Sequence, residues 1–327
     1  MTYPTLDTIV LSTIDLYWEQ SNLPQLDLSG FQTPLVVWSG NGYYTGRILF
    51  RNLGAFFATE SEVEQKLANI ESITDVIVIS ASGEKHAPII LNTAKQHNKN
   101  TFLISSSQKS SGQDIADHTI VMPKIREPYT YNTSTYFGYM LAEDPSLDLV
   151  ALREFITGTL ENSLRNSPLE VSSSPLLGDE LWRSRSAKRG GVVGLNFNHY
   201  SSFCIVIPNE FVLLREMFET KFIELFGRKV ARDVFSYEQM KHATTVVQDS
   251  RELFLCFGNE TGIVYGINQI DLPIFDTKSY AAMMLVGYYV VGKIQTALSP
   301  YFMDSIAEYC TRAKAQSGFN IAPWVEV

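Results

Sequence analysis

Residues 76–88 decide the fold, and they read Val76-Ile77-Val78-Ile79-Ser80-Ala81-Ser82-Gly83-Glu84-Lys85-His86-Ala87-Pro88. A β-branched run, typical of a buried strand, ends in a turn rich in hydroxyl groups, and residues 89–95 can form a helix. A helix that begins directly after a strand presents unpaired main-chain N–H groups, and its dipole adds positive potential. The hydroxyls of Ser80 and Ser82, the glycine Gly83 and the charge of Lys85 suit an anion there. The alternative is a plain strand-to-helix turn with a serine cap.

The next segment repeats this pattern and supports the first interpretation. A second apolar strand at 101–105 runs into a serine-rich turn at 105–112, which contains Ser105 and Ser107. Residues 115–118 then lead to a third strand at 119–122. Strands that alternate with serine-rich turns and a helix predict a parallel sheet whose loops gather at one edge.

The order of these motifs resembles the sugar isomerase (SIS) domain family. The resemblance spans about residues 34–153 and rests on S-x-S-G-E at 80–84, I-S-S at 104–106 and I-A-D-H-T-I-V-M-P at 115–123. An earlier landmark is the strand and glycine turn at 36–44, and a later one is Glu127 followed six residues on by Thr133-Ser134-Thr135. The resemblance implies a doubly wound αβα module that binds a phosphorylated sugar. The residues it implies for the phosphate and sugar are Gly42, Tyr43, Tyr44, Ser80, Ser82, Gly83, Glu84, Lys85, Ser105, Ser107, Glu127 and Thr133.

Composition narrows the class of protein further. The chain has 327 residues, of which 45% are hydrophobic and 19% charged, and its net charge of -9 argues against nucleic acid as the main partner. The start of the chain has no signal-peptide pattern, and the longest apolar segment, 281–292, is too short to span a membrane. Three widely spaced cysteines and histidines without metal spacing predict buried, reduced thiols in a cytoplasmic protein with no metal and no cofactor.

The second half repeats the pattern of the first more loosely. We expect an N-terminal helical lead-in at 1–30, a first SIS domain at 31–165, a linker at 166–190 and a second SIS domain at 191–327. Its expected elements are strands at 203–207, 234–236, 253–258 and Ile274-Phe275, a helix at 211–228 and a helical tail at 278–315. The chain thus resembles the tandem SIS family that includes the isomerase half of glucosamine-6-phosphate synthase and the fructosamine-6-phosphate deglycases. The apolar C-terminal helix pattern and the family's habit of building sites near subunit contacts predict a homodimer.

Residues 214–242 resemble the family segment in which a helical glutamate precedes an E-x-x-K-H loop. The resemblance implies that Glu224 moves a proton between two sugar carbons and that His242 opens the sugar ring; the spacing, 242 − 224 = 18, is about two longer than the family's. Proton transfer through a cis-enediol needs such a carboxylate over both carbons, and imidazole exchanges protons near neutral pH. The alternative is an ordinary helix-surface ion pair of Glu224 with Lys221 or Arg228, and a structural His242.

Several positions depart from the family pattern. Lys85 stands where the family has threonine, aromatic Tyr43 and Tyr44 replace small residues, and residues 320–327 lack the family's catalytic lysine. These departures argue against glucosamine-6-phosphate synthase activity. Two classes of function remain open: an isomerase, deglycase or deaminase of a phosphorylated hexose or amino sugar, or a catalytically silent sugar-phosphate sensor or partner subunit. The sequence does not identify the sugar.

Overall fold

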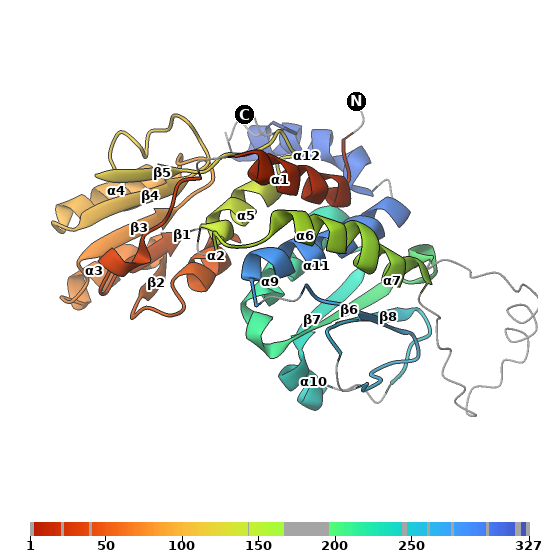
Figure 1. Cartoon of the computed structure of the whole chain (residues 1–327). Coiled ribbons are helices and arrows are strands. Elements are labelled where there is room, and N and C mark those ends of the chain that lie inside the picture. The colour runs from red at the N-terminus through yellow and green to blue at the C-terminus, as the bar shows by residue number, and fades with distance from the viewer. Residues whose placement is uncertain are drawn as a thin grey trace, which may run out of the picture.

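The computed structural model describes residues 3–20, 23–38, 41–142, 144–166, 196–243, 247–259, 262–275, 278–298, 301–317 and 322–324. Two parallel sheets lie on either side of a layer of helices (Figure 1). The expected linker at 166–190 lies, except for its first residue, outside the described residues.

The first sheet is entirely parallel, as the sequence predicted, and has five strands in the order β2-β1-β3-β4-β5. Its strands are β1 (Leu35–Trp38), β2 (Phe56–Thr59), β3 (Asp75–Ile79), β4 (Asn100–Ser105) and β5 (His118–Val121). Every residue of β1 and β3 is buried, because helices cover both faces of the sheet. The sequence did not predict β2, a four-residue strand at the sheet edge with no β-branched run.

Helices on the two faces of this sheet use alternate residues of the same strands. Leu35 and Val37 of β1 pack against α3 (Val63–Asn69) and α4 (His86–Gln96). Val36 and Trp38 belong to the larger core, which includes α2 (Asn41–Leu49) and α5 (Thr133–Leu141). This alternation is the period of a strand, and it places α2 and α4, which follow neighbouring strands, on opposite faces of the sheet.

The second sheet has four parallel strands in the order β7-β6-β8-β9. Its strands are β6 (Ser202–Ile207), β7 (Ala231–Ser236), β8 (Glu252–Phe257) and β9 (Gln269–Leu272). The prediction of a strand at Ile274-Phe275 is wrong, since the fourth strand ends at Leu272 and Pro273 has no N–H for a ladder. The helix expected at 211–228 is a 3-10 segment, η5 (Asn209–Leu214), followed by α9 (Arg215–Phe226), and α10 (Tyr237–Ala243) follows β7.

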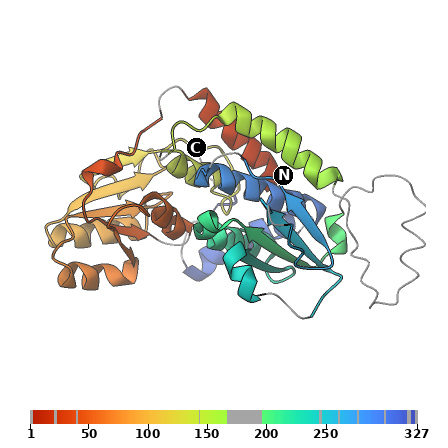
Figure 2. The ribbon, with the colours of Figure 1, turned by 60° about the horizontal axis from the view of Figure 1, so that its bottom comes forward.

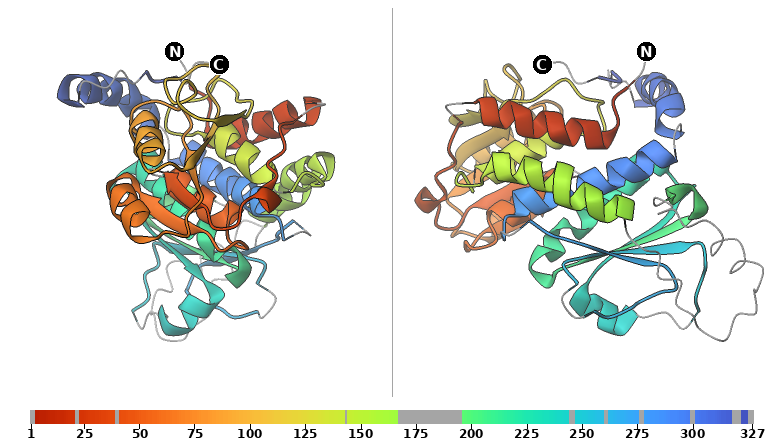
Figure 3. Two further views of the ribbon diagram at one scale, coloured as in Figure 1. Left: turned by 90° about the vertical axis from the view of Figure 1, so that its left-hand side faces the viewer. Right: turned by 45° about the vertical axis from the view of Figure 1, so that its right-hand side comes forward.

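A helical layer joins the two sheets. It contains α1 (Leu6–Glu19), the continuous run of α6 (Leu149–Glu154), η3 (Phe155–Leu160) and α7 (Glu161–Asn166), and α11 (Tyr280–Ala297), with α12 (Tyr301–Ser317) beside it (Figures 2 and 3). Short 3-10 turns, η1 (Leu28–Gly30), η2 (Glu60–Glu62) and η4 (Phe197–His199), complete the described elements. One apolar core runs from β1 through this layer to β6 and β8, so the two halves share a core.

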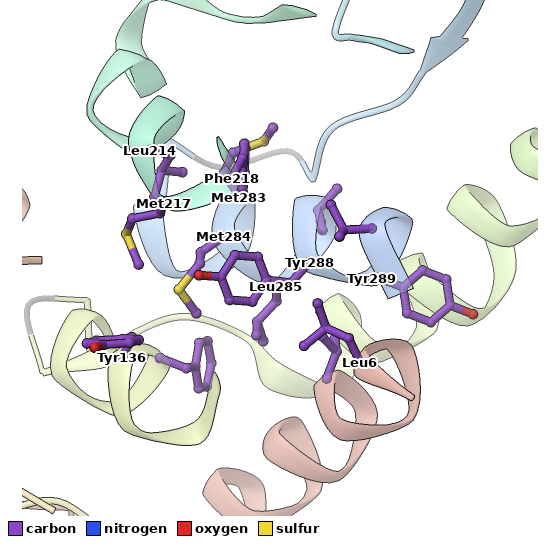
Figure 4. Packing of buried hydrophobic residues seen from close by; sticks show 14 of the residues in the cluster. Leu6, Tyr136, Leu214, Met217, Phe218, Met283, Met284, Leu285, Tyr288 and Tyr289 are labelled. Carbon is purple, nitrogen blue, oxygen red and sulfur yellow. The ribbon is translucent and has the colours of Figure 1, made fainter. Parts of the chain in front are cut away.

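The first helix packs on the last part of the chain. The N–H of Leu6 donates to Oε1 of Gln295 at 2.8 Å, and the main chain of Asp7 lies so close to Gly292 that a Cβ there would come within 2.1 Å of it. Figure 4 shows Met284, Leu285 and Tyr288 of α11 between α9 and Leu6. The apolar surface of α11, read from the sequence as a sign of dimerisation, is therefore buried within the chain, and the homodimer stays a prediction.

Two further expectations concern single features of the chain. All three cysteines are free and buried, as expected. No single helix in the described ranges is long and apolar enough to cross a membrane; α11 and α12 together pass that test of length and composition but are bent by 100°.

Candidate functional site

A cleft of about 1170 Å³ opens at the carboxyl edge of the first sheet, facing η5 and α9 of the second half. The chain leaves β1 for α2 on one face and leaves β3 for α4 on the other, so this edge is the topological switch point, where open α/β sheets bind ligands. The cleft is lined by Trp38, Asn41, Tyr43, Tyr44, Arg47, Thr59, Glu60, Ser61, His86, Ile89, Val212, Leu213, Arg215, Glu216, Thr220 and Gln239.

Glycines let α2 lie close to the strands and turn its aromatic residues to the cleft. A Cβ on Gly42 would come within 3.2 Å of the Ile79 carbonyl, and one on Gly46 within 3.0 Å of the Trp38 ring. The Tyr43 ring packs edge to face on Trp38 at 4.2 Å and on Tyr44 at 4.9 Å. Gly42 therefore has a packing role, and the two tyrosines form a wall of the cleft; their contact with a sugar stays a prediction.

Two buried polar atoms on this wall have no hydrogen-bond partner among the residues that the structure describes. They are Nε1 of Trp38, whose side chain is 2% exposed, and Oδ1 of Asn41, which is 6% exposed. Because unsatisfied buried polar groups are rare and costly, their position beside a cleft points to a ligand that accepts one hydrogen bond and donates another. This pair could not be predicted from the sequence, since it depends on how α2 packs.

The turn after β3 has the backbone that the sequence predicted for an anion site. Gly83 and Lys85 have positive φ angles of 65° and 58°. The hydroxyl of Ser80 accepts from the N–H of Gly83 at 3.1 Å, and that of Ser82 accepts from the N–H of Glu84 at 3.3 Å. Among the described residues, the N–H groups of Ala81 and Ser82 have no acceptor. The next residue, His86, lines the cleft, so the turn adjoins it.

The neighbouring serine-rich turn braces this one. Glu84 accepts from the N–H of Ser111 at 2.9 Å and from its hydroxyl, so its carboxylate ties the two turns together. The hydroxyl of Ser105 donates to the Ala81 carbonyl at 3.3 Å, and that of Ser107 donates to the Lys109 carbonyl at 2.7 Å. These three side chains thus hold the loop, and their contact with a ligand stays a prediction.

Glu127 and Thr133 lie in the core, away from the cleft lining. The Glu127 carboxylate, 1% exposed, accepts from the N–H groups of Thr133 at 2.9 Å and Ser134 at 3.1 Å and from the Ser134 hydroxyl at 2.7 Å. It caps the start of α5, and its burial raises its pKa while these hydrogen bonds act in the opposite direction. The structure does not bring Glu127 to the residues that line the cleft.

Glu224 lies on α9, one turn beyond the cleft-lining Thr220 and therefore on the same helix face. The ammonium of Lys221 donates to Glu224 Oε2 at 2.7 Å and also to the carbonyls of Thr130 at 2.6 Å and Tyr131 at 2.9 Å. The Lys221 side chain is fully buried, whereas that of Glu224 is 29% exposed. The ion pair that the sequence allowed as an alternative is thus formed, and it fixes one oxygen of a partly accessible carboxylate.

His242 is not brought to Glu224 within one chain. It is exposed at the end of α10, and no hydrogen bond, ion pair or ring contact in the described ranges joins it to Glu224 or to the 80–85 turn. Figures 1 and 2 both show α10 well apart from α4. Gln239, three residues earlier on α10, does line the cleft.

Charges of both signs line the cleft, and most are paired. His86 Nδ1 contacts the Glu60 carboxylate, and Arg215 pairs with Glu219 at 3.0 Å. Burial, followed by the Glu216 carboxylate, raises the pKa of Tyr44. Arg47 lies with its guanidinium 5.7 Å from the centre of the Tyr43 ring and forms no ion pair with any described residue.

Comparison with known proteins shows what kind of fold this is. No family model and no curated protein sequence matches the chain. Among solved structures, glucosamine-6-phosphate deaminase from Thermotoga maritima is 15% identical, with a TM-score of 0.62 over 90% of this chain and 93% of that one. Tagatose-6-phosphate ketose/aldose isomerase from Escherichia coli is 11% identical, with a TM-score of 0.53 over 90% and 88%.

A third similar structure is the C-terminal domain of glucosamine-fructose-6-phosphate aminotransferase from Francisella tularensis. It is 12% identical, with a TM-score of 0.53 over 89% of this chain and 94% of that one. At such identities the likeness is one of fold. The chain has the α/β fold, with parallel sheets, of phosphosugar isomerases and deaminases.

Proposed function

We propose that the protein binds a phosphorylated hexose or amino sugar in the cleft and moves a proton between two of its carbons through Glu224. The observation that carries this proposal is the cleft at the switch point of the first sheet, lined by His86, which directly follows the 80–85 turn, and by Thr220, one turn before Glu224 on α9. Structures of the same fold include a glucosamine-6-phosphate deaminase and a tagatose-6-phosphate ketose/aldose isomerase, which supports a reaction of this class.

The 80–85 turn suits the phosphate. The N–H groups of Ala81 and Ser82 have no acceptor among the described residues, the start of α4 adds positive potential, and the exposed Lys85 supplies a full charge. With the phosphate there, sugar hydroxyls can accept from Trp38 Nε1 and donate to Asn41 Oδ1.

The chemistry assigned to Glu224 is transfer of one proton. The carboxylate takes a proton from the carbon beside the carbonyl, a cis-enediol or enolamine forms, and the carboxyl group returns a proton to the neighbouring carbon after it has had the chance to exchange with solvent. Lys221 holds Oε2, so Oε1, which has no partner among the described residues, remains for the substrate. An isomerase, a deaminase and a deglycase share this step.

Exchange with solvent deuterium tests the proposal. The protein is incubated in D2O with hexose and amino-sugar 6-phosphates, and deuterium at C1 and C2 is followed by NMR. Wild type should incorporate deuterium, Glu224→Gln should bind the same ligand without exchange, and Glu71→Gln, a surface control, should behave as wild type. Exchange at the wild-type rate by Glu224→Gln would remove Glu224 from the mechanism.

A catalytically silent sugar-phosphate sensor or partner subunit is the second candidate. The lack of any contact between His242 and Glu224 in the described residues favours it, because no interaction in one chain then joins the proposed ring-opening group to the proposed proton-transfer group. Under this alternative, sugar phosphates raise the melting temperature of the protein, yet no ligand takes up deuterium. If His242 does open the ring, His242→Ala should slow turnover of closed-ring substrate more than that of an open-chain analogue.

A further inference from the structure

The cleft extends well beyond the edge of the sheet. Its inner part, at the sheet edge, is bounded by Trp38, Asn41 and His86, and its outer part runs along α2 opposite η5 and α9. A helix rises 1.5 Å per residue, so Arg47 lies about 9 Å along α2 from Asn41. The volume of about 1170 Å³ exceeds the roughly 300–1,000 Å³ of most small-molecule sites. A phosphosugar held at the 80–85 turn leaves this outer arm open.

The cleft has apolar side chains that solvent reaches. Ile89 of α4 is 56% exposed and Val212 of η5 is 38% exposed, and both line the cleft, from opposite halves of the chain. The half-buried Tyr44 of α2 also lines it. An aliphatic stem that covers these side chains would remove apolar surface from water.

Arg47 is the cation of the cleft that has no acidic partner among the described residues. The other basic side chains of the cleft differ: Arg215 pairs with Glu219, and His86 contacts the Glu60 carboxylate. The guanidinium stays 5.7 Å from the Tyr43 ring centre, an arrangement that holds its plane in place while leaving its N–H groups available. A planar guanidinium with free N–H groups matches a carboxylate in two parallel hydrogen bonds.

We infer that the ligand is a phosphosugar bearing a short apolar substituent that ends in a carboxylate, and that Arg47 binds this carboxylate in the outer arm. The inference rests on the proposed function for the phosphosugar part. It adds the chemical class of the substituent and the residue that selects it.

Binding of ring-locked probes tests this inference without turnover. The probes are the 3-carboxypropyl glucoside 6-phosphate, its primary amide, and the carboxypropyl glucoside without phosphate, each titrated by calorimetry. Wild type should bind the acid about tenfold more tightly than the amide, the order expected for a charge-assisted pair. Arg47→Gln should lose this preference, and Arg228→Gln, which removes an exposed arginine elsewhere on the chain, should keep it. Melting temperatures near that of wild type confirm that both variants fold.

The outcomes separate this inference from the proposal beneath it. If acid and amide bind wild type equally while phosphate is still required, the carboxylate inference is wrong and the phosphosugar site stands. If the preference survives in Arg47→Gln, Arg47 is not the residue that reads the carboxylate. If the phosphate-free glucoside binds as well as its phosphate ester, the phosphosugar site itself is wrong, whatever the acid and amide show.

Discussion

Lys221 and Glu224 are joined by a 2.7 Å ion pair within one turn of α9, although one side chain is fully buried and the other partly exposed. The ammonium also reaches the carbonyls of Thr130 and Tyr131, which precede α5 in the first half of the chain. One cation therefore fixes a candidate catalytic carboxylate and anchors α9 to the loop before α5.

Replacing Lys221 should cost far more stability than replacing a surface lysine in a similar pair. Lys221→Met leaves two carbonyl oxygens and one carboxylate without their hydrogen-bond donor. We therefore expect a loss of about 3 kcal/mol in the free energy of unfolding, measured in urea. Lys241→Met is the matched control, because Lys241 pairs with Glu238 at the same 2.7 Å with both side chains about 60% exposed. Its loss should stay within about 0.5 kcal/mol. Similar losses for the two variants would refute the anchoring role.

Glu127 should make the stability of the protein depend on pH. Its pKa is raised by burial, so the folded state favours the protonated form, and stability is lost as pH rises through the raised pKa. Glu127→Gln keeps an acceptor for the N–H groups of α5 without ionising. The stability of wild type relative to Glu127→Gln should therefore fall as pH rises above the ordinary carboxyl pKa of about 4.3, as followed by thermal melts.

A cap with the opposite pKa shift provides the control for Glu127. The N–H and hydroxyl of Thr59 bind Glu62 and lower its pKa, so its contribution is present at neutral pH and is lost as pH falls. The stability of wild type relative to Glu62→Gln should shrink in acid. If the stability difference from wild type changed with pH in the same direction for both variants, the conclusion that ionisation of the buried Glu127 destabilises the folded state would be wrong.

Two glycines with similar φ angles allow backbone strain to be distinguished from steric crowding at the 80–85 turn. Gly83 and Gly227 have φ angles of 65° and 60°, but a Cβ on Gly83 would lie 2.2 Å from the Ser110 hydroxyl, whereas one on Gly227 meets nothing within 4 Å. Gly227→Ala should cost about 1 kcal/mol and Gly83→Ala roughly 3 kcal/mol, both from chemical denaturation. Gly83→Ala should also weaken sugar-phosphate binding. A smaller loss at position 83 than at 227 would count against the packed turn.

Lys85 should distinguish a phosphorylated ligand from its unphosphorylated analogue. Lys85→Ala is expected to weaken a bound hexose 6-phosphate about tenfold in calorimetry and to leave the free hexose nearly unchanged, because the charge acts on the phosphate. Lys109→Ala, an exposed lysine on the neighbouring turn, serves as control. An equal loss for both sugars in Lys85→Ala would show that Lys85 does not read phosphate.

The sequence predicted most strands because buried parallel strands carry continuous apolar runs, as at 76–79 and 203–207. It failed at the sheet edges, where one side of a strand meets solvent. In β9 only Ile270 and Leu272 are buried, so the alternating Gln269–Leu272 gave a weaker signal than the apolar Ile274-Phe275 beyond the proline.

The candidate site was predictable where it depends on local chain geometry. The 80–85 turn and the tyrosines of α2 fall in this class, because strand, turn and helix follow one another in the sequence. Arg47 and the unpaired atoms of Trp38 and Asn41 do not, since their significance comes from the facing η5 and α9. Glu127 was predicted to bind the sugar because of the resemblance to the SIS family. Its hydrogen bonds to the start of α5 show that it caps this helix in the core.

The packing of α1 on α11 constrains how the chain reaches this structure during synthesis. Leu6, Val10 and Ile14 of α1 are fully buried, and the helix on which they close, α11, begins only at Tyr280. Helix α1 therefore leaves the ribosome well before the helix that covers it, and until then its apolar side is uncovered or shielded by a chaperone. A chain that stops before residue 278 should expose these residues to protease, and protection of α1 should appear only once α11 has been made.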